Sequence, residues 1–172
     1  VMCNLFLADE INRTSSKTQS ALLEVMEEGS VTIDGVTRVL PKPFLVIATQ
    51  NPIGSVGTQM LPESQLDRFM IKLNMGYPDL QSEVDILKAR HSENPIDHVH
   101  QVASAEDIVR LQRQTEQIYV DDRIYNYIAS LAQATRQHPM LRLGISPRGT
   151  LALTAAAKAT ALLRGRDYVT SD

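Results

Sequence analysis

The feature that most restricts the possible fold is a short apolar run, residues 5–8, that ends in two adjacent carboxylates. The run Leu-Phe-Leu-Ala is too short for a globular helix and does not alternate with polar residues. Such a run is typical of a strand buried on both faces of a mostly parallel sheet. Open α/β sheets bind ligands at the carboxyl ends of their strands, where Asp9 and Glu10 follow. We therefore predict an α/β fold with a ligand site beside these two carboxylates.

The chemistry of this site follows from its two adjacent negative charges. Two carboxylates in a half-buried place repel each other, so either one is protonated or a cation holds them. Mg²⁺ takes one or two protein carboxylates and fills its other positions with water and phosphate oxygens. Neighbouring strand residues point in opposite directions, so Asp9 can hold the water shell of a metal while Glu10 faces an attacking water. The alternative interpretation is a solvated acidic turn after a strand.

A second apolar run, residues 44–49, predicts a neighbouring buried strand that ends at Gln50, Asn51 and Pro52. The amide of Asn51 would lie at the same edge of the sheet as the carboxylates, because carboxyl ends of parallel strands meet there. It could position a water or contact a phosphate. Asn-Pro is also an ordinary opening of a turn, so this residue alone does not establish a site.

Between the two predicted strands the sequence indicates a helix and then a β-hairpin. Residues 14–16 are Thr-Ser-Ser, which favours a helix start, and Gly29 ends the helical pattern. Residues 31–39 are two alternating β-branched arms around Asp34-Gly35. Asp-Gly between such arms is the strongest short-range signal of a hairpin, and it fits a structural connection as well as a functional one.

Three arginines are candidates for contacting a phosphate. Arg68 follows a short predicted helix over residues 63–67, where an isolated Arg is most often a surface ion pair of little energetic value. Arg148 lies in the first turn of a predicted helix, where a cation faces the positive end of the helix dipole at a cost of up to about 1 kcal/mol. A bound anion would reverse that cost. Arg13 follows the carboxylates and could serve either a phosphate or an acidic neighbour.

The character of the sequence changes at Tyr77-Pro78. Before this point we predict one more strand, over residues 69–73, and beyond it helical periodicity replaces strand patterns. Helix caps are predicted at Asp79, Ser104, Asp121 and Ser146. We therefore expect an α/β part over residues 1–77 and a helical part over residues 78–172. Residues 169–172 look like the start of another helix, and residue 1 lies in or just before a strand, so we expect sequence to be missing at both ends.

Composition narrows the possible partners and compartment. The chain has 172 residues and a formal net charge of −3, with its Lys and Arg residues spread along the sequence. This balance disfavours nucleic acid as the primary ligand, because it offers no basic footprint. No stretch reaches the eighteen or so apolar residues of a membrane span. The single cysteine, Cys3, fits a reducing compartment, and we expect a cytoplasmic protein.

Five segments, in this order, resemble AAA+ ATPases and, within them, the MoxR family: LFLADEINR, VTIDGVTRV, VIATQNP, PESQLDRF and SPRG. The resemblance implies ATP and Mg²⁺ as cofactors. By position it implies that Asp9 and Glu10 are the Walker B residues that bind the metal and the attacking water. It likewise implies that Asn51 is sensor 1, that Arg68 is the arginine finger, and that Arg148 is sensor 2 at the start of a lid helix. In such rings, often hexamers, the finger serves the nucleotide of the next subunit, and the hairpin before sensor 1 faces the central pore.

The sequence departs from that family in one large respect. The phosphate-binding pattern G-x-x-x-x-G-K-[ST] occurs nowhere in the 172 residues. We therefore expect a partial AAA+ core followed by a helical lid, and no ATPase activity from this segment alone. For the parent protein the resemblance implies Mg²⁺-dependent ATP hydrolysis and chaperone-like remodelling of partner proteins, often beside proteins with von Willebrand factor A domains.

Two other classes of function stay open. One is a protein-binding module that keeps the AAA+ shape without nucleotide and uses the hairpin and the lid as its contact surface. The other is an action on nucleic acid through the hairpin, which the negative net charge of the chain disfavours. Nucleotide titration of the natural protein separates the first of these from an ATPase.

Overall fold

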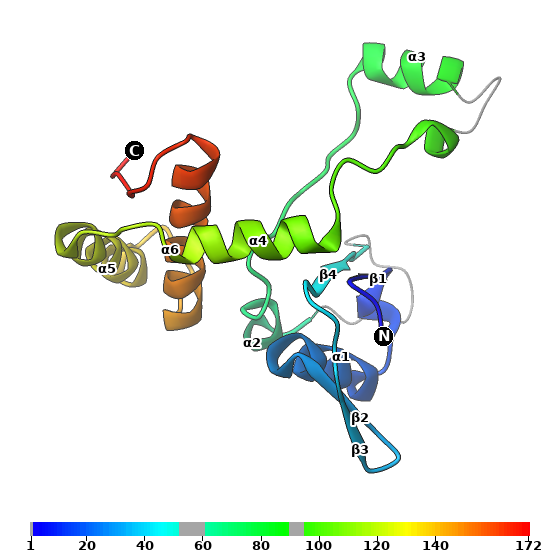
Figure 1. The fold of residues 1–172 in the computed structure, drawn as a ribbon, viewed down its shortest axis with the longest axis horizontal. Helices are drawn as coiled ribbons and strands as arrows, with labels where there is room; N and C mark the ends of the chain where they lie inside the picture. The colour runs from blue at the N-terminus through cyan, green and yellow to red at the C-terminus, as the bar shows by residue number, and fades with distance from the viewer. Residues whose placement is uncertain (1, 52–60, 90–94) are drawn as a thin grey trace. The chain divides into compact units, whose positions relative to one another are not determined.

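The computed structural model describes residues 2–51, 61–89 and 95–172. In chain order its elements are β1 (Leu5–Ala8), a 3₁₀ turn (Ile11–Arg13), α1 (Ser16–Glu28), β2 (Ser30–Ile33), β3 (Val36–Val39), β4 (Leu45–Ala48), α2 (Glu63–Leu66), α3 (Leu80–Ala89), a 3₁₀ turn (Pro95–His98), α4 (Ala105–Glu116), α5 (Asp122–Gln137) and α6 (Pro147–Leu163) (Figure 1). The predicted α/β class with a following helical region is confirmed. Two compact units are present, one formed by Val1–Met70 with Ala105–Asp172 and one by Ile71–Ser104.

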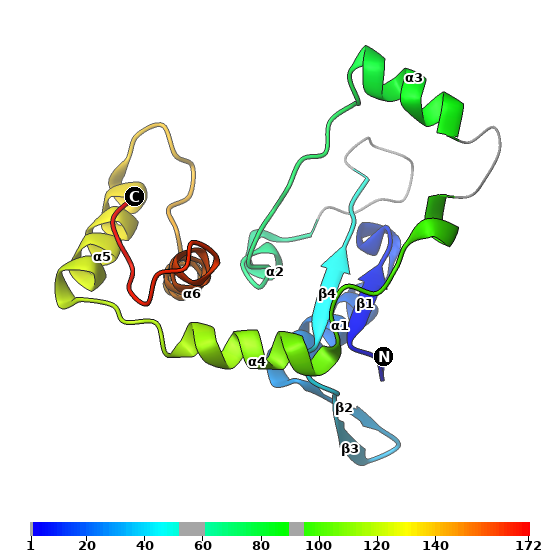
Figure 2. The same ribbon diagram turned by 45° about the horizontal axis from the view of Figure 1, so that its top comes forward.

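The strands β1 and β4 pair in parallel, with Leu5 opposite Leu45 and Ala8 opposite Ala48 (Figure 2). This pairing confirms the predicted parallel arrangement and places the carboxyl ends of both strands at one edge of the sheet. The prediction that the first strand is buried on both faces is wrong. Leu5 is 58% exposed and Leu7 is 62% exposed, because the two paired strands leave one face of this small sheet without a packing element among the described residues.

The helix α1 follows its predicted signals at both ends. The hydroxyl of Ser15 accepts a hydrogen bond from the Thr18 amide at 3.2 Å, which satisfies one of the free amides of the first turn. At the other end Gly29 adopts a left-handed conformation with φ of 60°, and its amide donates to the Val25 carbonyl. Leu23, only 1% exposed, fixes the buried face of the helix.

The strands β2 and β3 form the predicted antiparallel hairpin, with Ile33 opposite Val36. The two connecting residues, Asp34 and Gly35, both have positive φ, at 52° and 77°. Two-residue turns of this kind match the natural twist of paired strands, which is why Asp-Gly favours them. The hairpin is largely exposed, and its apolar Val39 is 72% exposed.

The predicted strand over residues 69–73 is wrong. Residues 71–79 form no helix or strand, and Ile71 and Leu73 are 65% and 77% exposed. An apolar run becomes a strand only when another strand supplies hydrogen-bond partners, and none of the described strands lies beside this run. The compact units divide the chain near this point, at Met70, while the boundary proposed at Tyr77-Pro78 stays a prediction.

The second unit, Ile71–Ser104, contains α3 and the second 3₁₀ turn. The predicted cap is present, because an Asp79 carboxylate oxygen accepts the Ser82 amide at 2.8 Å. That hydrogen bond lowers the pKa of Asp79 below its usual range. The helix buries none of its described side chains, and Leu80 and Leu87 are 80% and 68% exposed.

The helices α4, α5 and α6 pack around a small apolar core. Its buried members are Ile118, Val120, Ala161 and Val169, with Ile124, Ala157 and Leu162 packed against them. The predicted caps of the last two helices are present: Asp121 accepts the Arg123 amide at 2.9 Å, and Ser146 accepts the Gly149 amide at 3.0 Å. No helix among the described residues is both long enough and apolar enough to span a bilayer.

The last residues, 169–172, form no helix within this chain, and the helix predicted to start there stays a prediction. Tyr168 instead pairs with Tyr119 in a parallel β-bridge, and the Val169 amide donates to the Tyr119 carbonyl at 3.0 Å. Val169 is only 7% exposed. Burial of this side chain in the apolar core formed with Ile118, Val120 and Ala161 favours the extended bridge, because the bridge ties the end of the chain to the segment between α4 and α5.

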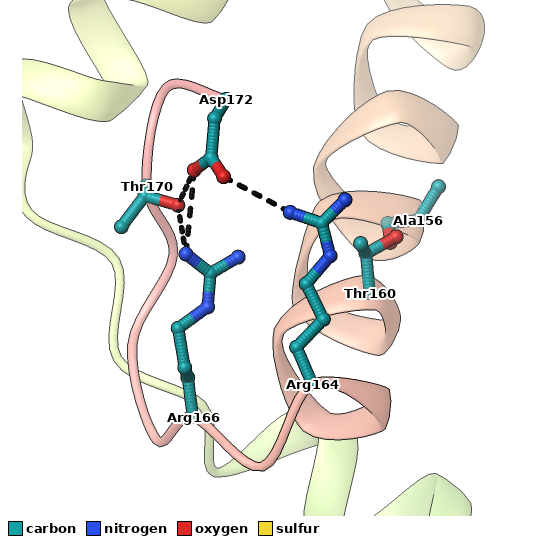
Figure 3. A network of polar contacts seen from close by, with 6 residues as sticks. All are labelled: Ala156, Thr160, Arg164, Arg166, Thr170 and Asp172. Carbon is teal, nitrogen blue, oxygen red and sulfur yellow. Dashed lines mark hydrogen bonds and ion pairs between the residues drawn. The ribbon is translucent and has the colours of Figure 1, made fainter.

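The carboxylate of Asp172 gathers two arginines and a hydroxyl at the end of the described chain (Figure 3). One carboxylate oxygen accepts Arg164 at 2.9 Å, and the other accepts Arg166 at 3.3 Å as well as the hydroxyl of Thr170. The hydrogen bond from Thr170, and next the one from Arg166, lower the pKa of Asp172 to about 2.

We expect this cluster to loosen only in strong acid. A carboxyl whose pKa is lowered on folding stabilises the folded state above its unfolded pKa, and that contribution is lost as the pH falls through the folded value. For Asp172 the window therefore runs from its ordinary pKa of 3.8 down to about 2. A carboxyl ¹³C NMR titration should show Asp172 titrating below its ordinary pKa of 3.8, near 2. Titration of Asp172 at its ordinary pKa would contradict the cluster.

Candidate functional site

The site is built where β1 and β4 end side by side. Thr49, the residue after β4, extends the pairing by one residue: its amide donates to the Ala8 carbonyl, and its carbonyl accepts the Ile11 amide, both at 3.0 Å. Asp9 and Glu10 lie between these two hydrogen bonds in the sequence. The backbone of the second strand therefore fixes both ends of the acidic turn.

The hydroxyl of Thr49 also contacts both acidic residues. It donates to the Asp9 carboxylate at 2.5 Å and accepts the Glu10 backbone amide at 2.8 Å. The sequence predicts a ligand site at this edge of the sheet from Asp9, Glu10 and Asn51. Thr49 was missed, because a β-branched residue in an apolar run is also an ordinary strand residue. Its one distinguishing signal is a hydroxyl at the position where the second strand ends.

The backbone of Glu10 is left-handed, with φ of 47° and ψ of 49°. A residue other than glycine is uncommon in this region and costs on the order of 1–3 kcal/mol, so it persists where its surroundings determine it. The strand has already ended at Ala8, so strand alternation does not set the direction of the Glu10 side chain. The left-handed turn between Asp9 and Ile11 sets it instead.

Arg13 pairs with Glu10. The guanidinium donates to a Glu10 carboxylate oxygen at 2.7 Å, and this hydrogen bond together with the negative charge raises the pKa of Arg13. The two side chains are 52% and 37% exposed, so solvent screens the pair and it is weak. Arg13 thus contacts an acidic neighbour in the structure, and its role toward a phosphate stays a prediction.

The buried side-chain amides of Asn12 and Gln19 form hydrogen bonds to the backbone around the acidic turn. Asn12 is only 1% exposed, and its side chain both donates to the Asn51 carbonyl at 3.2 Å and accepts the Asn51 amide at 3.4 Å. Gln19, from α1, donates to the Ile11 carbonyl at 3.1 Å. Asn12 therefore holds Asn51 next to the acidic turn by its backbone, while Gln19 holds the turn itself at Ile11. Sequence reasoning missed both, while the adjoining Pro52 lies outside the described residues.

The other two predicted arginines meet on one carboxylate. The two oxygens of Glu27, near the end of α1, accept Arg68 at 2.9 Å and Arg148 at 2.5 Å. The cation in the first turn of α6 therefore has a local partner that offsets the helix dipole. Within the described residues, neither arginine forms an ion pair with Asp9 or Glu10. The predicted site residues thus form two groups, the acidic turn with Asn51 and the pair held by Glu27.

The donor set fits Mg²⁺ bound largely by phosphate and water. Within the part of the chain that the structure describes, no three His, Cys, Asp or Glu residues lie close enough together to hold a metal. Asp9 offers an exposed carboxylate with one oxygen already bonded to Thr49. Because Mg²⁺ is commonly held by one or two carboxylates plus phosphate oxygens, a single carboxylate is sufficient.

Comparisons with known proteins agree on one family. Residues 1–71 match the model of the ATPase family associated with various cellular activities (AAA), and residues 133–172 match the AAA lid domain. YeaC of Bacillus subtilis is 55% identical over 100% of this chain, which covers 54% of YeaC. Chaperone MoxR1 of Mycobacterium tuberculosis is 44% identical over 98% of this chain, which covers 47% of MoxR1.

A solved structure gives the same result for the fold. The crystal structure of a protein from Cytophaga hutchinsonii, named as a candidate ATPase, superimposes with a TM-score of 0.91 at 38% identity. The match covers 99% of this chain and 55% of that protein. The chain thus spans about half the length of the relatives that it matches.

Proposed function

Since this chain belongs to the AAA+ ATPases, as a member of the MoxR family, we propose that the natural protein hydrolyses ATP with Mg²⁺. The observation that carries this proposal is the acidic turn, where Asp9 and Glu10 are held at the carboxyl end of β1 by Thr49 of the neighbouring strand. Asp9 would hold Mg²⁺ through water. Bound Mg²⁺ would neutralise charge on the transferring phosphate.

Glu10 would orient the attacking water and accept its proton, assisted by the amide of Asn51. A carboxylate can do this only when it is ionised and within reach of the water. The exposed Glu10–Arg13 ion pair is weak enough to open when substrate arrives. Arg13 would then be free to contact a phosphate.

Arg68 and Arg148, which both pair with Glu27, would serve the phosphates. A guanidinium is planar and always charged, which suits it to spread positive charge over a phosphoryl group. As the finger, Arg68 would act on the nucleotide of the next subunit, which requires a ring, and we propose a hexamer. Whether Arg148 acts on the same nucleotide follows from where the lid lies in that ring.

The work driven by hydrolysis is proposed to be chaperone-like remodelling of partner proteins in the cytoplasm. MoxR1, 44% identical to this chain, is itself named a chaperone. The exposed hairpin β2–β3, with Val39 72% exposed, supports a contact surface for partner proteins. Proteins with von Willebrand factor A domains are the partner class that we propose to test first.

Hydrolysis by the natural full-length protein and by residues 1–172 tests this function. We expect the full-length protein to release phosphate from Mg-ATP and to stop when EDTA removes the metal. We expect the segment to release none, because its sequence lacks the pattern that cradles the β and γ phosphates. Full-length protein that binds no nucleotide in a titration would instead support the protein-binding module. Hydrolysis by the segment would contradict the role given to the absent pattern.

A further inference from the structure

We propose that Thr49 is a positioning residue of this site, whose hydroxyl fixes both the metal carboxylate of Asp9 and the backbone of Glu10. The proposal rests on the function proposed above. Thr49 forms four hydrogen bonds to four successive residues: its amide and carbonyl to Ala8 and Ile11, and its hydroxyl to Asp9 and Glu10. Any residue could make the two backbone bonds. Only a hydroxyl side chain at this position can make the other two.

The direction of each hydroxyl bond is determined by its partner. An ionised carboxylate only accepts and a backbone amide only donates, so the Thr49 proton goes to Asp9 and its lone pair receives the Glu10 amide. One oxygen thus satisfies both neighbours at once. Hydrogen bonds to an ionised group are roughly twice as strong as neutral ones, so the Asp9 bond orients this carboxylate firmly.

The same hydroxyl supports the strained turn. Glu10 has a left-handed backbone, with φ of 47°, and its amide would lack this partner if the Thr49 hydroxyl were removed. Because such a conformation persists only where neighbours determine it, loss of the hydroxyl should let Glu10 relax. Its carboxylate would then move away from the position that orients water. Thr49 therefore couples the metal residue to the water residue.

The test uses the natural full-length protein with Thr49→Val, which keeps the shape of the side chain and removes the hydroxyl. We expect a fall in kcat and a rise in the Mg²⁺ concentration at half-saturation, each by roughly 10- to 100-fold, the range seen when partners of metal ligands are removed. Thr49→Ser should restore both quantities toward wild type. Thr160→Val is the matched control, since its hydroxyl donates to the Ala156 carbonyl within the same helix, α6.

Two readouts do not depend on turnover. In Thr49→Val the NMR signal of the Glu10 amide proton should shift upfield. An EPR titration in the presence of ADP should show weaker binding of Mn²⁺. If the wild-type protein hydrolyses no ATP, the function proposed above fails, while these two readouts still decide the role of Thr49. Unchanged Mg²⁺ and Mn²⁺ dependence in a folded Thr49→Val protein would overturn the proposal.

The serine variant separates the hydroxyl from the methyl group. If Thr49→Ser behaves like Thr49→Val, the methyl packing matters and the proposal is overturned. If Thr49→Val does not fold, Thr49→Ser is compared with Thr49→Ala, which differs from it by one hydroxyl. A higher Mg²⁺ concentration at half-saturation in Thr49→Ala than in Thr49→Ser supports the proposal, and equal values overturn it.

Discussion

Replacing Glu10 with Gln in the natural full-length protein is expected to stop ATP turnover and leave ATP bound. The amide has nearly the shape of the carboxylate but cannot take a proton from water, and loss of such a group typically costs 10²- to 10⁴-fold in rate. The change also removes the ion pair with Arg13, which is exposed and therefore weak. Phosphate release and the ATP retained after gel filtration measure the two effects.

The matched control for this experiment is Glu24→Gln, an exposed carboxylate on α1 that belongs to no part of the proposed site. It removes the same charge from the same region and should leave turnover at the wild-type level. Turnover near wild type in Glu10→Gln would refute the role of this residue. Loss of ATP binding together with turnover would place Glu10 in binding instead of in the chemical step.

The parts of the fold that were predictable depend on local signals. Ser15 and Gly29 mark the ends of α1 by the hydrogen bonds that each can make there, and Asp34-Gly35 matches the positive φ values that its turn requires. The parallel pairing of β1 and β4 followed from two apolar runs with a long connection between them. The helix ends and the turn are thus decided by interactions within one element, and the strand pairing by the apolar pattern of each strand.

The parts of the site that were missed depend on contacts across about forty residues. Thr49 reaches Asp9 and Glu10, and Asn12 reaches Asn51, only because one register of the parallel pair brings those positions together. That register is a property of two strands, and neither strand carries it alone. The side chains involved are ordinary strand and loop residues in isolation, so no local pattern marks them.

The arginine pair illustrates the same point from the other direction. Arg68 and Arg148 were selected separately, one by resemblance and one because it opposes a helix dipole. The structure joins them through Glu27, a residue that the helical pattern of α1 marks only as solvent-facing. The strand predicted over residues 69–73 does not form, although the run is apolar, because none of the described strands pairs with it.

Mixing two inactive variants is expected to recover part of the activity. Arg68→Ala removes the proposed finger, which in related phosphoryl transfer is worth about 10³- to 10⁵-fold in rate, and Glu10→Gln removes the water residue. If the finger acts on the next subunit, one kind of mixed interface carries an intact Glu10 on one side and an intact Arg68 on the other. Random mixing of equal amounts in a head-to-tail ring makes about one quarter of the interfaces of this kind.

The two variants should be co-expressed with different tags and purified through both, so that every ring assayed contains both subunits. Recovery to a sizeable fraction of wild-type phosphate release shows that Arg68 acts across the interface, because each subunit by itself still carries one defect. As control, Arg68→Ala is mixed with the double variant Arg68→Ala/Glu10→Gln, where no interface has an intact finger and no recovery is expected. No recovery in the first mixture, with both tags present, would mean that Arg68 serves its own subunit, and its release from Glu27 would then be an event within one chain.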